Sequence, residues 1–197
     1  MSYNRNMATL VPETRLALIH RVIVPDEDYP KEDAILVTNR HSIFIHQRKT
    51  RSSFVLRQEM RFGTALVTDV TLKTLEDYEG SSLETLVSDS ENLTIPHESI
   101  ISLSMRADPI EHRKREFFVW MVMKRQKEIF QVYNFEIKYR QGQNSETGIR
   151  FYAVPLGAYF KAKRQVQTRE TILRDYAAEV LETYRTVLPE RIISSAG

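Results

Sequence analysis

Short clusters of lysine and arginine are the residues of this sequence with the clearest potential for chemistry. Cationic side chains, together with the backbone N–H groups of loops, can converge on a phosphate. Most of the clusters are expected in loops, and they supply the candidate residues for binding an anion or a partner. These residues are Arg48, Lys49 and Arg51, then Lys124, Arg125 and Lys127, and finally Lys161, Lys163 and Arg164.

A further cluster, Arg113, Lys114 and Arg115, stands just before the apolar run FFVWMVM at residues 117–123. A short apolar run between polar flanks predicts a strand that is buried on both faces. This cluster and the one at 124–127 would then lie at opposite ends of the same strand. Such a placement disfavours a single phosphate-binding pocket lined by both clusters.

No pattern of an enzyme or a metal site accompanies these cations in the sequence. The histidines form no H-x-x-x-H or H-E-x-x-H pair, and there is no cysteine; the histidines are His20, His41, His46, His97 and His112. A G-x-S-x-G elbow and glycine-rich nucleotide loops are missing as well. The acidic residues at 26–28 indicate a solvated turn rather than a cation site. We therefore expect no enzyme activity, no catalytic residues, no metal and no cofactor.

Charge is distributed unevenly, although the formal net charge is only +2. Residues 61–110 carry 3 basic and 9 acidic residues, a net charge of −6, whereas residues 111–169 carry 13 and 5, a net charge of +8. Aromatic residues are interleaved with this basic stretch, including Tyr139, Phe151, Tyr159 and Phe160. An alternative function is therefore nucleic-acid binding through residues 111–169, with rings stacked on bases. The other interpretation of the same aromatics is that they fill the core.

The apolar patterns predict mostly β-strands. Residues 15–24 form a β-branched run, and residues 34–46 form a second run interrupted by Thr38-Asn39-Arg40. Because asparagine tolerates left-handed backbone angles, we expect two short strands joined by a turn at Asn39. A strand-like alternation of apolar and polar residues appears again within residues 93–105. The strict alternation at 129–139 predicts the first strand of a hairpin over residues 129–154.

Two helices are predicted. A short one covers residues 82–87 with Ser82 as its N-cap. A long amphipathic helix begins after Thr168, carries Glu170 in its first turn and ends at Pro189. About six strands followed by one terminal helix describe a mainly β (α+β) chain capped by a helix.

The length of 197 residues suits a single domain with a substantial core. We expect an extended or disordered N-terminus over 1–12, one domain over 13–190 with an insertion at about 47–92, and a flexible tail over 191–197. No apolar stretch of about 18 residues predicts a transmembrane helix, and the first residues lack the apolar region of a signal peptide. These features favour a cytoplasmic location, with a peripheral membrane location also compatible.

Two motifs resemble those of the pleckstrin-homology (PH) superfold, and in particular of GRAM domains and prokaryotic PH-like domains. The run ILVTNRHSIFIH, starting at Ile35, resembles their T-N-x-R strand pair, and LTIPHESIISLSMR, starting at Leu93, resembles their I-P-x-x-x-I strand. Residues 47–92 between the motifs are longer than a simple strand connection. The resemblance implies a strongly bent, seven-stranded sheet or barrel whose C-terminal helix plugs one open end. It also implies a non-enzymatic module that binds or scaffolds a partner protein or an anionic surface.

Overall fold

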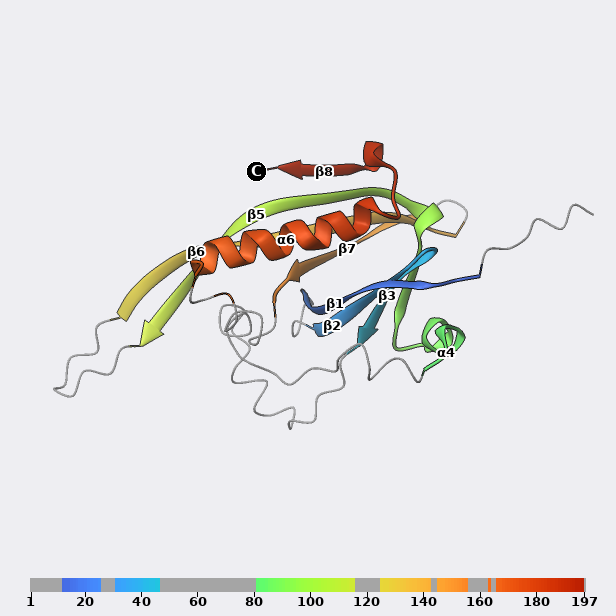
Figure 1. The fold of residues 1–197 in the computed structure, drawn as a ribbon, viewed down its shortest axis with the longest axis horizontal. Coiled ribbons are helices and arrows are strands. Elements are labelled where there is room, and N and C mark those ends of the chain that lie inside the picture. The colour runs from blue at the N-terminus through green and yellow to red at the C-terminus, as the bar shows by residue number, and fades with distance from the viewer. Residues whose placement is uncertain are drawn as a thin grey trace, which may run out of the picture.

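The strands of this chain hydrogen-bond into one open sheet, on which a single long helix packs. The computed structural model describes residues 12–25, 31–46, 81–115, 125–142, 145–155, 163 and 166–196. Within these residues, eight strands follow the order β4-β3-β2-β1-β7-β6-β5-β8 (Figure 1). Neighbouring strands are antiparallel, except for the parallel pair β5 and β8. The prediction of a mainly β chain is confirmed.

The elements follow one another in a simple order along the chain. The first are β1 (Arg15–Val24), β2 (Lys31–Thr38), β3 (His41–His46), α4 (Leu83–Ser88), β4 (Leu93–Pro96) and the 3-10 helix η1 (His97–Ser99). They are followed by β5 (Ile100–Arg115), β6 (Arg125–Gln141), β7 (Ser145–Ala153), α6 (Arg169–Arg185), the 3-10 helix η2 (Glu190–Ile192) and β8 (Ile193–Ala196).

A tight turn at Asn39 and Arg40 separates β2 from β3, as the sequence predicts. The Thr38 hydroxyl accepts a hydrogen bond from the backbone N–H of His41 at 2.7 Å. The Asn39 side chain ties this turn to the chain ahead of β1, since its Oδ1 accepts from the backbone N–H of Thr14 at 2.9 Å. These bonds end β2 at Thr38 and fix where β3 begins, which confirms the prediction of two short strands.

Both faces of β2 and β3 are buried, which explains their almost continuous apolar sequence. One face contributes Ile35, Val37 and Phe44 to the main core. The opposite face contributes Leu36, Ile43 and Ile45 to a smaller cluster beneath Leu86 of α4. Helix α4 begins as predicted, because Ser82 Oγ accepts from the backbone N–H of Thr85 at 3.1 Å.

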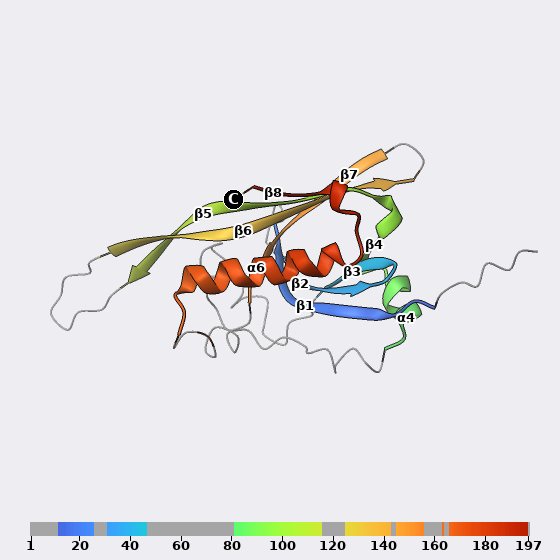
Figure 2. The same cartoon turned by 45° about the horizontal axis from the view of Figure 1, so that its top comes forward.

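Helix α6 closes the main core, which lies between it and the sheet (Figures 1 and 2). Its predicted N-cap is confirmed, since Thr168 Oγ1 accepts from the backbone N–H of Thr171 at 3.2 Å. The apolar stripe of the helix is buried, as at Ile172, Val180 and Tyr184. Below it, the rings of Phe135 and Phe151 stack at 5.2 Å between centroids. The helix ends at Arg185 with Thr186 as its C-cap, and so stops before it reaches Pro189.

Two further differences from the predicted elements lie at residues 93–105 and 193–196. The run at 93–105 is not one strand, because Pro96 ends β4 and η1 intervenes before β5. Residues 193–196 were expected in a flexible tail, yet they form β8, which pairs with β5 from Leu103 to Arg106. In the part of the chain that the structure describes, no helix has the length and apolar character needed to cross a bilayer.

Candidate functional site

The longest strands, β5 and β6, form a ribbon that leaves the rest of the sheet. Strand β8 pairs with β5 only from Leu103 to Arg106, and β7 pairs with β6 only from Asn134 to Gln141. Residues 107–115 and 125–133 therefore pair only with each other among the residues that the structure describes. We call this two-stranded part the ribbon. In Figures 1 and 2 it extends as an arm past the beginning of α6.

The far end of the ribbon is cationic. The register places Arg113 opposite Lys127, Lys114 opposite Gln126, and Arg115 opposite Arg125. Directly opposed residues, and residues two apart on a strand, belong to the same face of a ladder. Arg113, Arg115, Arg125 and Lys127 therefore share one face. We call residues 113–115 and 125–127 the cationic end.

This register overturns the predicted separation of the two clusters. Residues 113–115 and 125–127 were expected at opposite ends of a strand at 117–123, with the second cluster in a turn. Instead, both clusters are strand residues and lie side by side. The local pattern could not reveal this, because the polar flanks of FFVWMVM are themselves paired strands. Residues 117–123 and Lys124 lie outside the described residues.

The cationic end is an energetically unfavourable arrangement in isolation. Like charges at directly opposed positions destabilise an antiparallel pair, and the ribbon has two such positions. A two-stranded hairpin with no further strand is itself only marginally stable in water. A polyanion would relieve the repulsion, because it supplies opposite charge to the whole face at once.

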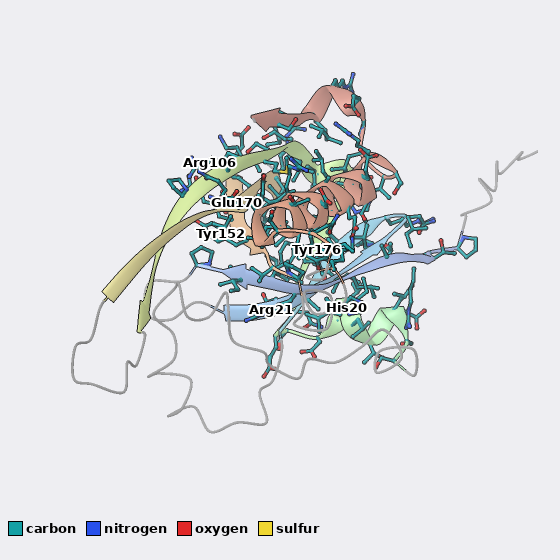
Figure 3. All side chains as sticks on the ribbon, turned by 60° about the vertical axis from the view of Figure 1, so that its left-hand side comes forward. His20, Arg21, Arg106, Tyr152, Glu170 and Tyr176 are labelled. Carbon is teal, nitrogen blue, oxygen red and sulfur yellow. The ribbon has the colours of Figure 1, made fainter. Side chains whose placement is uncertain are left out.

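A carboxylate fixes the base of the ribbon to the sheet. Asn134 Nδ2 on β6 donates to Asp108 Oδ2 on β5 at 3.1 Å, and the Tyr152 hydroxyl on β7 donates to the same oxygen at 3.2 Å. Arg106 Nε lies 3.2 Å from the other oxygen, Asp108 Oδ1. Figure 3 marks Arg106 and Tyr152, which come from the strands on either side of β6. Burial raises the pKa of Tyr152, and the negative charge of Asp108 raises it further.

Most of the other predicted site residues are not tested by this structure. Arg48, Lys49, Arg51, Lys161 and Arg164 lie outside the described residues. Lys163 is described, and its Nζ lies 3.3 Å from Glu179 Oε1 on α6. This ion pair ties Lys163 to the helix and satisfies part of its charge within the chain. Of the predicted set, Arg125 and Lys127 are the residues that the register brings opposite the further cluster at 113–115.

A second polar cluster surrounds the β2–β3 turn. Glu13 Oε1 accepts from the Thr38 hydroxyl at 2.6 Å and lies 2.8 Å from His41 Nδ1. Burial alone would raise the pKa of Glu13, but these hydrogen bonds and the charges of His41 and Arg40 hold it below its ordinary value. The cluster therefore stabilises the turn formed by Thr38, Asn39 and Arg40.

Ser42 and His97 lie beside this turn and have the atoms of a nucleophile and a base. Ser42 Oγ is 3.1 Å from His97 Nε2, but Ser42 has no exposed surface. The neighbouring carboxylate, Glu13, contacts His41 rather than His97. Burial, with a contribution from His41, lowers the pKa of His97 to about 4, although Glu13 acts in the opposite direction. A substrate cannot reach a serine buried in this way, so the pair is structural.

Two of the aromatics considered for base stacking belong to the interior. Phe151 is fully buried and Tyr139 nearly so, and both contribute to the main core. Tyr159 and Phe160 lie outside the described residues. Among the residues that can be assessed, no cluster of His, Asp or Glu has the size of a metal site.

Comparisons with known proteins identify no family for this chain. No family model matches it, and no curated protein does. Among solved structures, it is similar to the hSac2 domain from the human phosphoinositide phosphatase Sac2, with 10% sequence identity and a TM-score of 0.41. That alignment covers 96% of this chain and 81% of the other. A TM-score this low transfers neither fold nor function.

Proposed function

We propose that this protein is a non-enzymatic binding module of PH-like architecture that engages an anionic, phosphate-bearing partner through the cationic end of the ribbon. The architecture is supported by one continuous sheet whose C-terminal helix covers the core. It is also supported by the Thr38-Asn39-Arg40 segment, whose threonine and asparagine make the turn between β2 and β3. A cytoplasmic or peripheral membrane location accords with such a module.

One observation carries the proposed binding site, namely the register that opposes Arg113 to Lys127 and Arg115 to Arg125. A ribbon selected only for stability would alternate opposite charges across such pairs. The sequence instead has six Lys and Arg against one Glu over residues 113–127, a formal charge of +5. Arrangements that oppose stability are typical of binding surfaces, where function and stability make different demands.

The second candidate partner is nucleic acid. A two-stranded ribbon fits the major groove of B-form DNA, and cationic residues on its face would contact the phosphates. The expected contacts are with the sugar-phosphate backbone of the nucleic acid. Phe151 and Tyr139 are part of the protein core, so their rings are not available to stack on bases. The sequence alone suggested nucleic-acid binding through residues 111–169 with aromatic rings stacked on bases. The present alternative uses the cations of the ribbon instead of the rings.

The test is co-sedimentation of the full chain with anionic vesicles, neutral vesicles, a short single-stranded RNA and a DNA duplex. The variant replaces Arg113, Arg115, Arg125 and Lys127 by Gln. Because each Lys or Arg near an anionic surface contributes about 1 kcal/mol, binding should weaken by about a thousandfold. Added salt should weaken binding by the wild-type protein.

A matched control replaces Lys138, Arg140, Arg174 and Arg191 by Gln, which removes the same charge at exposed positions outside the ribbon. The control should bind nearly as the wild-type protein does. Equal losses in both variants would mean that only net charge matters and would overturn the proposed site. Undiminished binding by the ribbon variant would do the same.

A further inference from the structure

We infer that β8 is the contact surface between two copies of this chain, which pair through it across a two-fold axis into one continuous sheet. The inference is carried by the difference between the two edges of the sheet, only one of which is protected. It is independent of the proposed function, because it uses neither the cationic end nor an anion.

The described sheet ends in two edge strands, β4 and β8. An edge strand presents backbone N–H and C=O groups that no neighbouring strand pairs with, and another chain can add to it. Figures 1 and 2 show β8 along one border of the sheet, beyond β5. Both edge strands are four residues long, so shortness protects them equally. The difference between them lies in their residues.

Edge β4 is protected by the residues at its end. Pro96 has no N–H to donate to a further strand, and its carbonyl accepts a hydrogen bond from Ser99 Oγ at 2.7 Å. The chain then turns into η1, where the backbone N–H of His97 donates to the carbonyl of Arg40 at 2.8 Å. A further strand beside β4 would therefore find its path and part of its hydrogen-bonding groups already taken.

Edge β8 lacks such protection. Its residues, Ile193–Ala196, include no proline and no charged residue. Its register with β5 runs without a bulge from Leu103 to Arg106. Ser194 and Ser195 are exposed, and their small side chains would not obstruct a neighbouring strand. Natural sheets commonly protect an exposed edge with lysine, proline or a bulge. The open edge of β8 therefore fits a surface that is used for pairing.

A second copy of β8 is the occupant that this edge fits. Most small homo-oligomers are two-fold dimers in which the same patch of both chains meets itself. Antiparallel pairing of two β8 strands would satisfy the open backbone groups of both copies at once, and it would oppose no like charges within the strands. Ile193, and Met105 beside it on β5, are only partly buried against the main core, so the added strand would cover them further.

The experiment measures the mass of the full chain by sedimentation velocity over a series of protein concentrations. Two four-residue strands bury less area than the interface of a stable dimer, so we expect a reversible dimer whose fraction rises with concentration. Hydrogen exchange of residues 193–196 is followed in the same samples. Exchange at β8 should slow as the dimer forms, because the outward backbone N–H groups then gain partners.

A variant that replaces Ser194 and Ser195 by Lys tests the surface itself. Its dissociation constant should rise by about fivefold or more, because lysines of the two copies would be brought together across the axis. The matched control replaces Ser88 and Ser90 by Lys, which adds the same charge at exposed positions at and just after α4. The control should dimerise as the wild-type protein does. Thermal melting would verify that both variants fold.

Three results would overturn the inference. The first is a wild-type protein that stays monomeric up to about 1 mM, since even a weak contact would be populated there. The second is a dimer that the Ser194 and Ser195 variant retains undiminished, because the contact would then lie on another surface. The third is a monomer in which the backbone N–H groups of β8 are already fully protected from exchange, because the edge would then be covered within one chain.

Discussion

Arg113 on β5 stands directly opposite Lys127 on β6, in a ladder with no third strand beside it among the described residues. Two residues further along, Arg115 repeats the relationship with Arg125. The fold therefore concentrates like charge in the part of the sheet that has only two strands among the described residues. This relationship gives the first prediction.

Replacing Arg115 by Glu should stabilise the protein, because it converts a repulsive cross-strand pair with Arg125 into an attractive one. The expected gain is about 0.5–1 kcal/mol in the free energy of unfolding, and it should diminish in high salt. Urea denaturation at two salt concentrations would measure it. Lys114→Glu is the matched control, since residue 114 opposes the uncharged Gln126 and should give a smaller gain. Equal gains would show that the register does not hold in solution.

Replacing Asp108 by Asn should loosen the base of the ribbon. The substitution removes the charged acceptor that serves Asn134 and Tyr152 and the partner of Arg106. We expect a loss of about 1–3 kcal/mol in the free energy of unfolding. The pKa of Tyr152 should also fall, because the charge of Asp108 contributes to raising it. Denaturation and spectroscopic titration of tyrosine would measure the two effects, and an unchanged titration would argue against the contact.

Stability should decline when the pH falls from about 6.5 to about 4, because of His97. Burial lowers the pKa of His97 in the folded protein to about 4, so in this window the unfolded chain takes up a proton that the folded chain does not. The expected loss is about 2–3 kcal/mol in the free energy of unfolding. The contribution of His97 should level off below pH 4, where its imidazole becomes protonated in both states, while Glu13, whose pKa is also lowered, extends the decline at still lower pH.

The pH prediction can be checked with a His97→Asn variant. Denaturant unfolding at several pH values should show a shallower decline for this variant between pH 6.5 and pH 4 than for the wild-type protein. Superimposable pH profiles for the two proteins would mean that His97 does not carry the effect.

Replacing Val180 by Asp should unfold or aggregate the protein. Val180 lies on the buried side of α6 in the main core, and an unpaired charge there costs several kcal/mol. Ala178→Asp is the matched control, because Ala178 lies on the exposed side of the same helix. Thermal melting with size-exclusion chromatography would compare them. A soluble Val180→Asp monomer that melts like the control would contradict the packing of α6 on the sheet.

Several elements could be predicted from the sequence because they depend on interactions between residues that are close together along the chain. The N-caps Ser82 and Thr168, the turn at Asn39 and the alternation along β6 each depend on residues within a few positions of one another. Capping, turn formation and the two-residue period of a strand act over that distance. The mainly β composition and the amphipathic terminal helix followed from the same patterns.

The tertiary structure alone decided which segments became neighbours. The sequence identified the clusters at 113–115 and 124–127 as cationic, but it placed them at opposite ends of a strand. Strand pairing depends on hydrogen bonds between distant residues, and no local pattern reports which partner or register will form. For the same reason, the pairing of β8 with β5 and the contact of Asp108 with Tyr152 emerged only from the fold. The sequence thus determined that the chain carries concentrated positive charge, and the pairing of β5 with β6 gathered part of that charge onto one face.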